Sequence, residues 1–164
     1  MKPDNEFVFD VDTIASYLYS KKPNISPLKL QKSLYFLFAY HGAVYAQDSE
    51  VGVFEGVANG PQYLFEARFE AWQYGPVIRD VYNKDKRGFY SDPDLMEQAI
   101  EKVSRQQEIK MFIDDLFEQI DSVSDFKLVD RSHQDVAWKN AHAKGQSTEM
   151  NNEEIILEYK ESYV

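Results

Sequence analysis

The chain has 164 residues, a length that predicts one domain or one domain with an extension. Its hydrophobic content of 43% and aromatic content of 15% argue against disorder, and the absence of cysteine excludes disulfides and thiolate sites. Eighteen basic residues against 28 acidic ones give a formal net charge of −10. This charge disfavours nucleic-acid binding, because a phosphate backbone is held by clustered Lys and Arg.

The sequence shows no segment that predicts export or membrane insertion. The N-terminal stretch MKPDNEFVFDVD lacks the basic and apolar regions of a signal peptide. The longest apolar run, residues 33–46, is interrupted by His41 and Gly42 and is shorter than a bilayer span of about 20 residues. We therefore expect a soluble, cytoplasmic protein that has no membrane partner.

The first expected helix begins near Asp10 or Asp12, since either side chain can accept an N–H bond as an N-cap. The apolar residues that follow share one helical face: Val11, Ile14, Ala15 and Leu18. The stretch KKPN at 21–24 ends this helix, because Pro23 disfavours helical backbone at the residue before it.

A second helix is predicted from Ser26, which suits the N-cap, and Pro27, which suits the first helical position. Its narrow apolar seam consists of Leu30, Leu34, Leu37 and Phe38, and the seam is widened by Leu28, Tyr35 and Phe36. A helix that is apolar over most of its circumference is buried. This segment is therefore expected to be the central core helix.

The apolar period changes over residues 48–72. The segments VGVFEGV (51–57) and YLFEARFEAW (63–72) alternate in the manner of strands, and ANGPQ (58–62) between them has a turn composition. The pattern predicts a two-stranded hairpin between the second and third helices. Such a pair is marginally stable alone and must pack on helices.

Helical signals fill the rest of the chain. Gly75-Pro76 is expected to open a helix that ends near Asn83, and Asp92-Pro93 to start the next one. The polar stretch SRQQE (104–108) predicts a kink or a break into two helices, and shorter helices are expected at 125–132, 135–142 and 153–162. The predicted fold class is mainly α: a compact multi-helix domain with a small inserted β-hairpin.

A search for catalytic and metal-binding residues finds few candidates. The sequence contains no HExxH, GxxxxGK[ST], GxGxxG or GxSxG motif, and it has three histidines. His41 lies in the apolar helix and is interpreted as a buried core residue. His133 and His142 flank Asp135, but their spacing does not place metal ligands one helical turn apart. We predict no catalytic, cofactor or metal residues, and a hydrolase that uses His133 with Asp135 remains an alternative.

The stretch WQYGPV (72–77) allows two interpretations. Trp72 and Tyr74 can form a stacking platform for bases or for a proline-rich peptide. Alternation places both on one face of an extended segment directly before an expected helix, where large aromatic side chains usually contribute by burial. The packing interpretation is favoured, so Trp72 is expected to pack either in the core or between the ribbon and the helix that follows it.

Three blocks together resemble a known family. They are SPLKLQKSLYF (26–36), FEAWQYGPVIRDVY (69–82) and LVDRSHQDVAW (128–138). In this order they resemble the Panacea domain family, which includes SocA-like antitoxins and GepA-like phage-associated proteins, over about residues 10–160. Two departures are a longer segment at 48–64, interpreted as an insertion, and Ala137 where the family has proline before Trp138.

The resemblance implies that residues 1–164 form a single Panacea-like domain and that its signature positions are mostly structural. Among them, Gln31, Lys32 and Glu70 are polar and are expected either to support the Gly-Pro turn or to face a partner. The signature positions are Leu30, Gln31, Lys32, Tyr35, Glu70, Trp72, Tyr74, Gly75, Pro76, Val77, Tyr82, His133 and Trp138.

The resemblance also implies a function. Members of the family neutralise a co-encoded toxin by direct protein binding, and a SocA-like member can deliver its toxin to a protease such as ClpXP. We therefore expect a non-enzymatic, antitoxin-like binding protein without cofactors, of prophage or mobile-element origin, whose oligomeric state the sequence leaves open. The alternatives are the hydrolase with His133 and Asp135 and, least favoured, a DNA-binding regulator.

Overall fold

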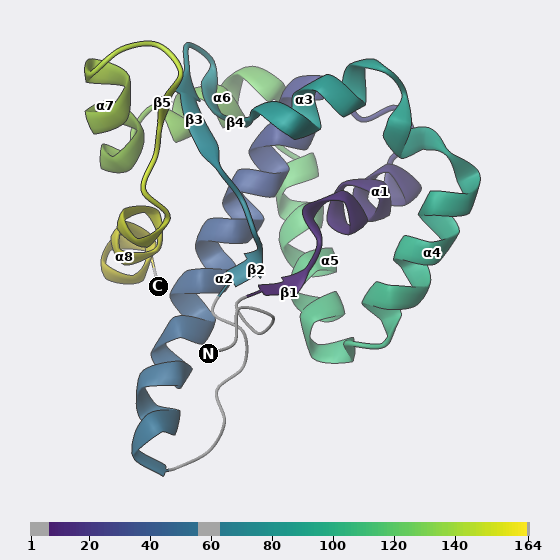
Figure 1. Ribbon diagram of the computed structural model, residues 1–164, viewed down its shortest axis with the longest axis horizontal. Coiled ribbons are helices and arrows are strands. Elements are labelled where there is room, and N and C mark those ends of the chain that lie inside the picture. The colour runs from purple at the N-terminus through teal and green to yellow at the C-terminus, as the bar shows by residue number, and fades with distance from the viewer. Residues whose placement is uncertain (1–6, 56–62, 164) are drawn as a thin grey trace.

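The computed structural model describes residues 7–55 and 63–163 and is mainly helical (Figure 1). In chain order its elements are β1 (Phe7–Phe9), α1 (Val11–Lys21), α2 (Pro27–Glu55), β2 (Tyr63–Phe65), β3 (Phe69–Trp72), β4 (Gly75–Ile78), α3 (Arg79–Lys86), the 3₁₀ turn η2 (Phe89–Ser91), α4 (Pro93–Ser104), α5 (Gln107–Asp121), α6 (Asp125–Ser132), α7 (Val136–Ala143), β5 (Thr148–Glu149) and α8 (Asn152–Ser162). The predicted fold class, helices with a small hairpin between the second and third helices, is confirmed.

Side-chain caps fix the starts of the first two helices as the sequence predicts. Asp10 Oδ1 accepts a 2.8 Å hydrogen bond from the backbone N–H of Asp12 at the start of α1. Ser26 Oγ accepts a 3.0 Å hydrogen bond from the N–H of Lys29, and α2 begins at Pro27. Each cap satisfies one of the backbone donors that a helix leaves unpaired at its N-terminus.

Helix α2 is the centre of the molecule, and most other elements pack around it (Figure 1). It contacts α8 on one side, α5 and α6 on another, and β2 and β4 along its length. All four residues of its predicted seam have no exposed surface: Leu30, Leu34, Leu37 and Phe38. The prediction of a central core helix is therefore correct.

One strand prediction is wrong, because α2 continues through Glu55. Residues 51–55, part of the predicted strand VGVFEGV, are helical, while residues 56–57 and the predicted turn at 58–62 lie outside the described residues. Alternating Val and Gly indicated a strand, but a helix that has already formed gains one hydrogen bond for each residue it adds. Propagation from the long apolar helix outweighs this local pattern.

The hairpin of the fold is formed by β3 and β4 instead. These strands pair antiparallel from Phe69 opposite Ile78 to Trp72 opposite Gly75, and β5 pairs with the other edge of β3. A separate parallel pair joins β1 to β2. The predicted strand at 63–72 is divided in the fold into β2 and β3. The sequence analysis did not predict β1 or β5, because strands of two or three residues are too short to show a period.

The prediction of a helix that opens at Gly75-Pro76 is also wrong at its start. Gly75 to Ile78 form β4, and α3 begins only at Arg79. Pro76 lies opposite Ala71 in the ladder. Because β4 is an edge strand, the pairing with β3 does not need the backbone N–H that a proline lacks.

The predictions for the C-terminal part of the chain are confirmed. Helix α4 ends at Ser104 and α5 begins at Gln107, so the polar stretch breaks the helix in two. Asp92 caps α4 ahead of Pro93, and Asn151 caps α8 by accepting the N–H of Glu154 at 2.9 Å. Helices α6 and α7 lie where the two short helices were expected.

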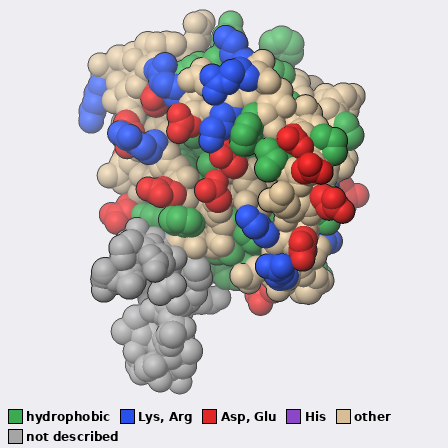
Figure 2. Space-filling view, turned by 45° about the vertical axis from the view of Figure 1, so that its right-hand side comes forward, with side chains coloured by type: hydrophobic (Ala, Val, Ile, Leu, Met, Phe, Trp, Pro, Cys, Tyr) green, Lys and Arg blue, Asp and Glu red, His purple; other side chains and the backbone are tan. Residues whose placement is uncertain are grey.

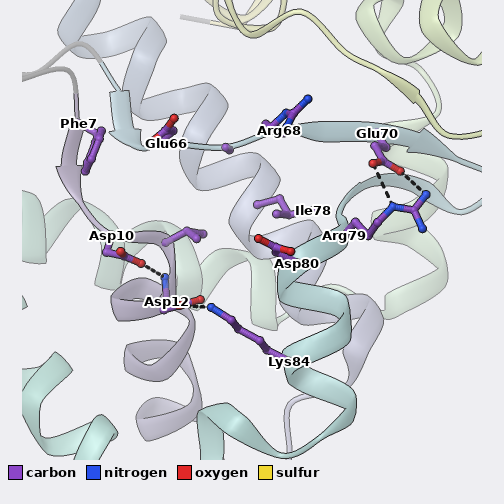
Figure 3. Close-up of a pocket in the computed structure, with 12 residues that line it drawn as sticks. Phe7, Asp10, Asp12, Glu66, Arg68, Glu70, Ile78, Arg79, Asp80 and Lys84 are labelled. Atoms are coloured by element: carbon purple, nitrogen blue, oxygen red, sulfur yellow. Dashed lines mark hydrogen bonds and ion pairs between the residues drawn. The ribbon is translucent and has the colours of Figure 1, made fainter. Parts of the chain in front are cut away.

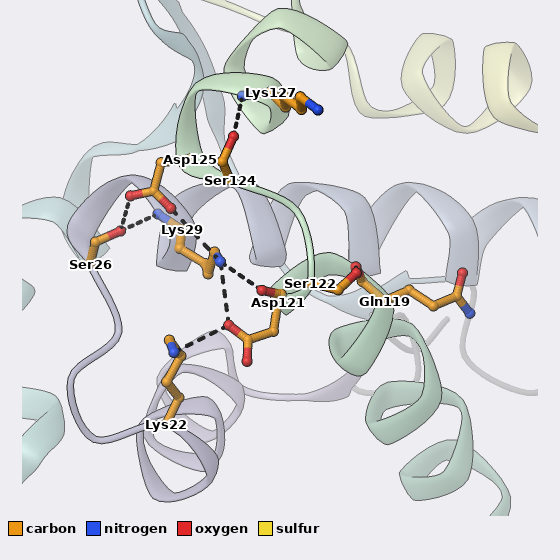
Figure 4. A network of polar contacts seen from close by, with 9 residues as sticks. All are labelled: Lys22, Ser26, Lys29, Gln119, Asp121, Ser122, Ser124, Asp125 and Lys127. Atoms are coloured by element: carbon orange, nitrogen blue, oxygen red, sulfur yellow. Dashed lines mark hydrogen bonds and ion pairs between the residues drawn. The ribbon is translucent and has the colours of Figure 1, made fainter.

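A lysine in the first turn of α2 fastens that helix to the corner between α5 and α6 (Figure 4). The Nζ of Lys29, whose side chain is nearly buried, donates to the backbone carbonyl of Asp121 at 3.0 Å and lies 3.3 Å from its carboxylate. Ser26 Oγ donates to Asp125 at 2.6 Å, and Lys22 pairs with Asp121 at 3.3 Å. These contacts join segments about 90 residues apart in the sequence.

Among the described residues, none of the helices combines the length and the apolar character that crossing a membrane requires.

Candidate interaction site around the hairpin

Gln31 of α2 takes the place of a missing strand at the free edge of β4. Its Oε1 accepts a 2.9 Å hydrogen bond from the N–H of Ile78, and its Nε2 donates to the carbonyl of Ile78 at 3.3 Å. The side chain amide therefore satisfies both backbone groups of one edge residue. A buried backbone group without a partner costs free energy, so this contact fixes the strand against the helix.

Lys32, the residue after Gln31 in α2, supports the same edge of β4. Its side chain has no exposed surface, and its Nζ donates a 3.0 Å hydrogen bond to the carbonyl of Pro76. Burial lowers the pKa of Lys32 to about 7. Next to it, Gly75 has a φ of +107°, and a Cβ at that position would lie 2.7 Å from Lys32 Cε and 2.4 Å from Ser132 Oγ.

Asp135 is the polar centre of the core behind the hairpin. Its carboxylate has no exposed surface and accepts hydrogen bonds from the hydroxyls of Tyr35 at 2.6 Å and Tyr159 at 2.5 Å. Arg131, in the last turn of α6, donates to the other oxygen at 2.7 Å. Burial first, and the neighbouring negative charge next, raise the pKa of Tyr159 well above its ordinary value, so this hydroxyl stays a donor.

A stack of three rings covers the turn of the hairpin. Trp138 lies between His133 and His142, with ring centroids 4.3 Å and 4.5 Å away. The indole Nε1 of Trp138 donates to the carbonyl of Trp72 at 3.0 Å, and Nε2 of His133 lies 2.8 Å from the carbonyl of Gln73. Helices α6 and α7 thus hold the backbone of the turn through polar contacts.

The outer side of the hairpin carries aromatic and charged side chains in alternation. Arg79 pairs with Glu70 through two hydrogen bonds of 2.9 Å and 3.2 Å and lies 5.3 Å from the ring of Trp72. Trp72 meets Tyr82 edge to face at 5.1 Å, and its Nε1 donates to Glu70 at 2.8 Å. We call Glu70, Trp72, Arg79, Tyr82 and the neighbouring Lys86 the hairpin face.

Of the two packing roles expected for Trp72, the structure shows the contact between ribbon and helix, because its half-buried side chain lies outside the core and packs on Tyr82 of α3. The residues of β3 that point inward are Phe69 and Ala71, and Glu70 and Trp72 point outward. Tyr74 at the turn is 57% exposed and also lies outside the core. Burial raises the pKa of Glu70, but the hydrogen bonds from Arg79 and Trp72 outweigh it and hold this pKa below its usual value.

A cleft of about 490 Å³ adjoins the hairpin face (Figure 3). It lies between β1, the extended residues 66–68 and the junction of β4 with α3. Five carboxylates and three cationic groups line it. Two ion pairs cross its rim: Lys84 to Asp12 at 2.6 Å and Arg79 to Glu70 at 2.9 Å.

The structure therefore brings the signature positions of the sequence together around one hairpin. Helix α2 supplies four buried residues, Leu30, Gln31, Lys32 and Tyr35, of which Gln31 and Lys32 bond to β4 and Tyr35 packs on Phe69. His133 and Trp138 hold the turn of the hairpin. Gly75, Pro76 and Val77 form the buried strand β4, whereas Glu70, Trp72 and Tyr82 belong to the exposed side. The sequence analysis missed the ion pair of Arg131 with Asp135, because the two residues belong to separate predicted helices, where no helical spacing indicates a contact.

The structure does not bring His133 and Asp135 together as a catalytic pair. The Asp135 carboxylate is held by Tyr35, Tyr159 and Arg131, and the ring of His133 stacks on Trp138 and contacts Gln73. Asp135 is also out of contact with solvent. Within the described part of the chain, no cluster of three or more His, Asp or Glu side chains is placed to hold a metal ion.

His41 is buried in α2 beside Tyr45 and Phe112, as the sequence predicts, and burial lowers its pKa to about 4. In the unfolded chain a histidine titrates near its ordinary value of about 6.5. The unfolded state therefore binds an extra proton between pH 6.5 and 4, and folding stability falls as the pH is lowered through this window.

We expect His41→Met to remove this pH dependence. Between pH 7 and pH 4.5 the wild-type protein should lose about 2 kcal/mol of unfolding free energy more than the variant does. Urea unfolding of both proteins at the two pH values measures the difference. Equal losses in the two proteins would show that His41 titrates in the folded state with its ordinary pKa, so that burial does not lower it.

Fold and site together define a helical domain whose polar core positions a hairpin with an exposed, charged and aromatic face. The family model described as "Antitoxin SocA-like, Panacea domain" matches residues 30–139, about two thirds of the chain. The chain belongs to the SocA-like antitoxin Panacea domain family. This membership suggests an antitoxin role and, with it, the binding of a toxin protein.

The matched range includes the seam of α2, the hairpin and two of the three stacked rings, His133 and Trp138. No curated protein and no solved structure shows a significant match to the chain.

Proposed function

We propose that the protein is a non-enzymatic, cytoplasmic antitoxin that neutralises a toxin encoded beside it by covering part of the toxin's surface. The observation that carries this proposal is the match to the SocA-like antitoxin family over residues 30–139. The toxin would be a small protein, and its gene would lie next to the gene of this chain. Phage or mobile-element origin belongs to the same proposal.

The contacts around the hairpin support the hairpin face as the binding surface. Backbone and side-chain contacts from α2, α6 and α7 fix the hairpin from behind, so its outer side chains have little conformational freedom to lose on binding. Trp72, Tyr82 and Arg79 are of the residue types that dominate the energy of protein interfaces. A fixed hairpin with these residues outside is suited to docking against a folded partner.

The surface charge supports a protein partner rather than a nucleic acid. On the face shown in Figure 2, acidic and basic side chains are intermixed. The whole chain carries a formal net charge of −10. Both features favour a partner with basic patches over a phosphate backbone.

Co-expression with the adjacent reading frame tests the antitoxin role. The small neighbouring protein, expressed alone, should arrest growth, and co-expression of this chain should restore it. The two proteins should also co-purify. If the neighbour is harmless, or if it is toxic and neither rescue nor co-purification occurs, the proposal is wrong.

A finer form of the proposal, based on the family resemblance, is that the bound toxin is handed to a protease such as ClpXP. In that case the toxin's half-life should shorten when the antitoxin is present and return to its longer value in cells without ClpXP. A half-life that the antitoxin leaves unchanged or lengthens would assign neutralisation to binding alone.

A further inference from the structure

We propose that the cleft beside the hairpin binds a lysine or arginine side chain of the partner toxin. This inference rests on the proposed function and names the chemistry by which that partner is recognised. The cleft shares Glu70 and Arg79 with the hairpin face, so one partner can cover both (Figure 3). Three features of the cleft favour a basic side chain: its backbone edge, its charge and its floor.

The backbone of residues 66–68 presents acceptors to the cleft. The carbonyls of Phe69 and Ala71 face β5, where they accept from Met150 N at 2.7 Å and Ser147 N at 3.0 Å. The carbonyl of Ala67 faces the same way and accepts from Asn152 Nδ2 at 2.9 Å. Because backbone groups alternate along an extended strand, those of Glu66 and Arg68 face the opposite edge.

That opposite edge is the cleft. Strand β1 ends at Phe9 on one side of it and β4 ends at Ile78 on the other, so neither strand pairs with residues 66–68. The carbonyls of Glu66 and Arg68 therefore remain as acceptors between two strand ends. The gap between the two strand ends is too short for a further strand, but it suits the charged group of one lysine or arginine side chain.

The charge of the cleft is negative because its cations are already paired. Arg79 is held by Glu70, Lys84 by Asp12, and Arg68 by Glu149 at 3.1 Å, outside the cleft. Within the described part of the chain, the lining carboxylates Glu66 and Asp80 make no direct hydrogen bond or ion pair, and Asp80 interacts with Arg68 and Lys84 only at longer range. A cation from a partner would find two carboxylates and the carbonyl edge together.

The floor of the cleft is apolar. Phe7, Val11, Ala67 and Ile78 line it below the charged rim. Lysine and arginine combine a hydrocarbon stem with a charged head, and they bind well where an apolar wall leads to acceptors. Arginine fits such a site best, since its planar head can donate to a carboxylate and a carbonyl at once.

The first test uses N-acetyl-arginine amide as the probe and does not depend on the toxin. Backbone amide shifts of the ¹⁵N-labelled protein at low salt should move at residues 66–68 and 78–80. N-acetyl-glutamine amide, a neutral probe, should leave these residues unchanged. Shifts spread evenly over acidic surface residues, or equal shifts with both probes, would overturn the proposal.

The second test uses the toxin and a pair of charge-matched variants. Glu66→Gln/Asp80→Asn removes two charges in the cleft, and Glu97→Gln/Glu118→Gln removes two exposed charges from α4 and α5. The cleft variant should weaken toxin binding about tenfold or more, as expected for a lost charged contact, and the control by less than about threefold.

The outcomes separate this inference from the proposed function. Failure of the wild-type protein to bind the toxin would contradict the proposed function itself. Tight wild-type binding with equal affinities for the two double variants would overturn only the assignment of the cleft. Dimerisation of the wild-type protein that is lost in the cleft variant alone would assign the cleft to a second copy and overturn the proposal.

Discussion

Replacement of Asp135 by asparagine is expected to lower the free energy of unfolding by about 3 kcal/mol. The change removes the negative charge that Arg131 and two tyrosine hydroxyls share in the core. Loss of one partner from a buried ion pair typically costs about 3–5 kcal/mol. We expect the lower end of this range, because the Arg131 side chain keeps 27% of its surface exposed.

Asp130→Asn is the matched control, since Asp130 is an exposed carboxylate in α6, the helix that also carries Arg131. It should change stability by less than about 0.5 kcal/mol. Urea unfolding at pH 7 compares the two variants with the wild type. Equal effects of the two substitutions would show that the Asp135 network does not stabilise the fold.

The second large effect is expected at Gly75, where even alanine should cost about 3 kcal/mol. A φ of +107° is unfavourable for a residue with a Cβ and accounts for about 1–2 kcal/mol. The added Cβ would also approach Ser132 Oγ to 2.4 Å and Lys32 Cε to 2.7 Å. Relief of these contacts would displace the lysine that supports β4.

Gly88→Ala separates the cost of the backbone conformation from the cost of close packing around an added Cβ. Gly88 has a φ of +76°, and a Cβ there would meet Ser91 Oγ at 3.9 Å, an ordinary contact. This variant should therefore lose only about 1–2 kcal/mol, from the backbone conformation alone. If thermal or urea unfolding gave both glycine variants the same loss, the close packing behind Gly75 would not contribute to stability.

Local signals in the sequence predicted most of the helices. Asp10, Ser26, Asp92 and Asn151 each accept a backbone N–H in the first turn of a helix, and caps of this kind depend on neighbouring residues only. The apolar seam of α2 is also a local pattern, because its residues lie within one segment of the chain, and it predicted the core helix. The hairpin was expected in the right interval of the chain.

The strands were harder to predict because their partners lie far away in the sequence. β5 pairs with β3 about 80 residues earlier, and β1 pairs with β2 about 56 residues later. The start of α3 was misplaced because Gly-Pro fits a helix start as well as an edge strand. What selects the strand is the contact of Gln31 and Lys32 with Ile78 and Pro76, which exists only in the fold.

The candidate site was predicted in part. The resemblance gathered the residues that surround the hairpin, yet alternation alone could not tell which face of β3 is buried. Phe69 and Ala71 occupy the inner face, so Trp72 and Glu70 lie outside. The cleft was not predicted, because its walls come from three separate segments of the chain.

The central claim is that the hairpin face and its cleft form the surface that binds a toxin. Hydrogen–deuterium exchange of the protein, free and in complex with the adjacent toxin, tests this claim most directly. Binding should slow exchange in residues 66–72 and 78–84. Slower exchange in α4 and α5, with these segments unchanged, would contradict the account.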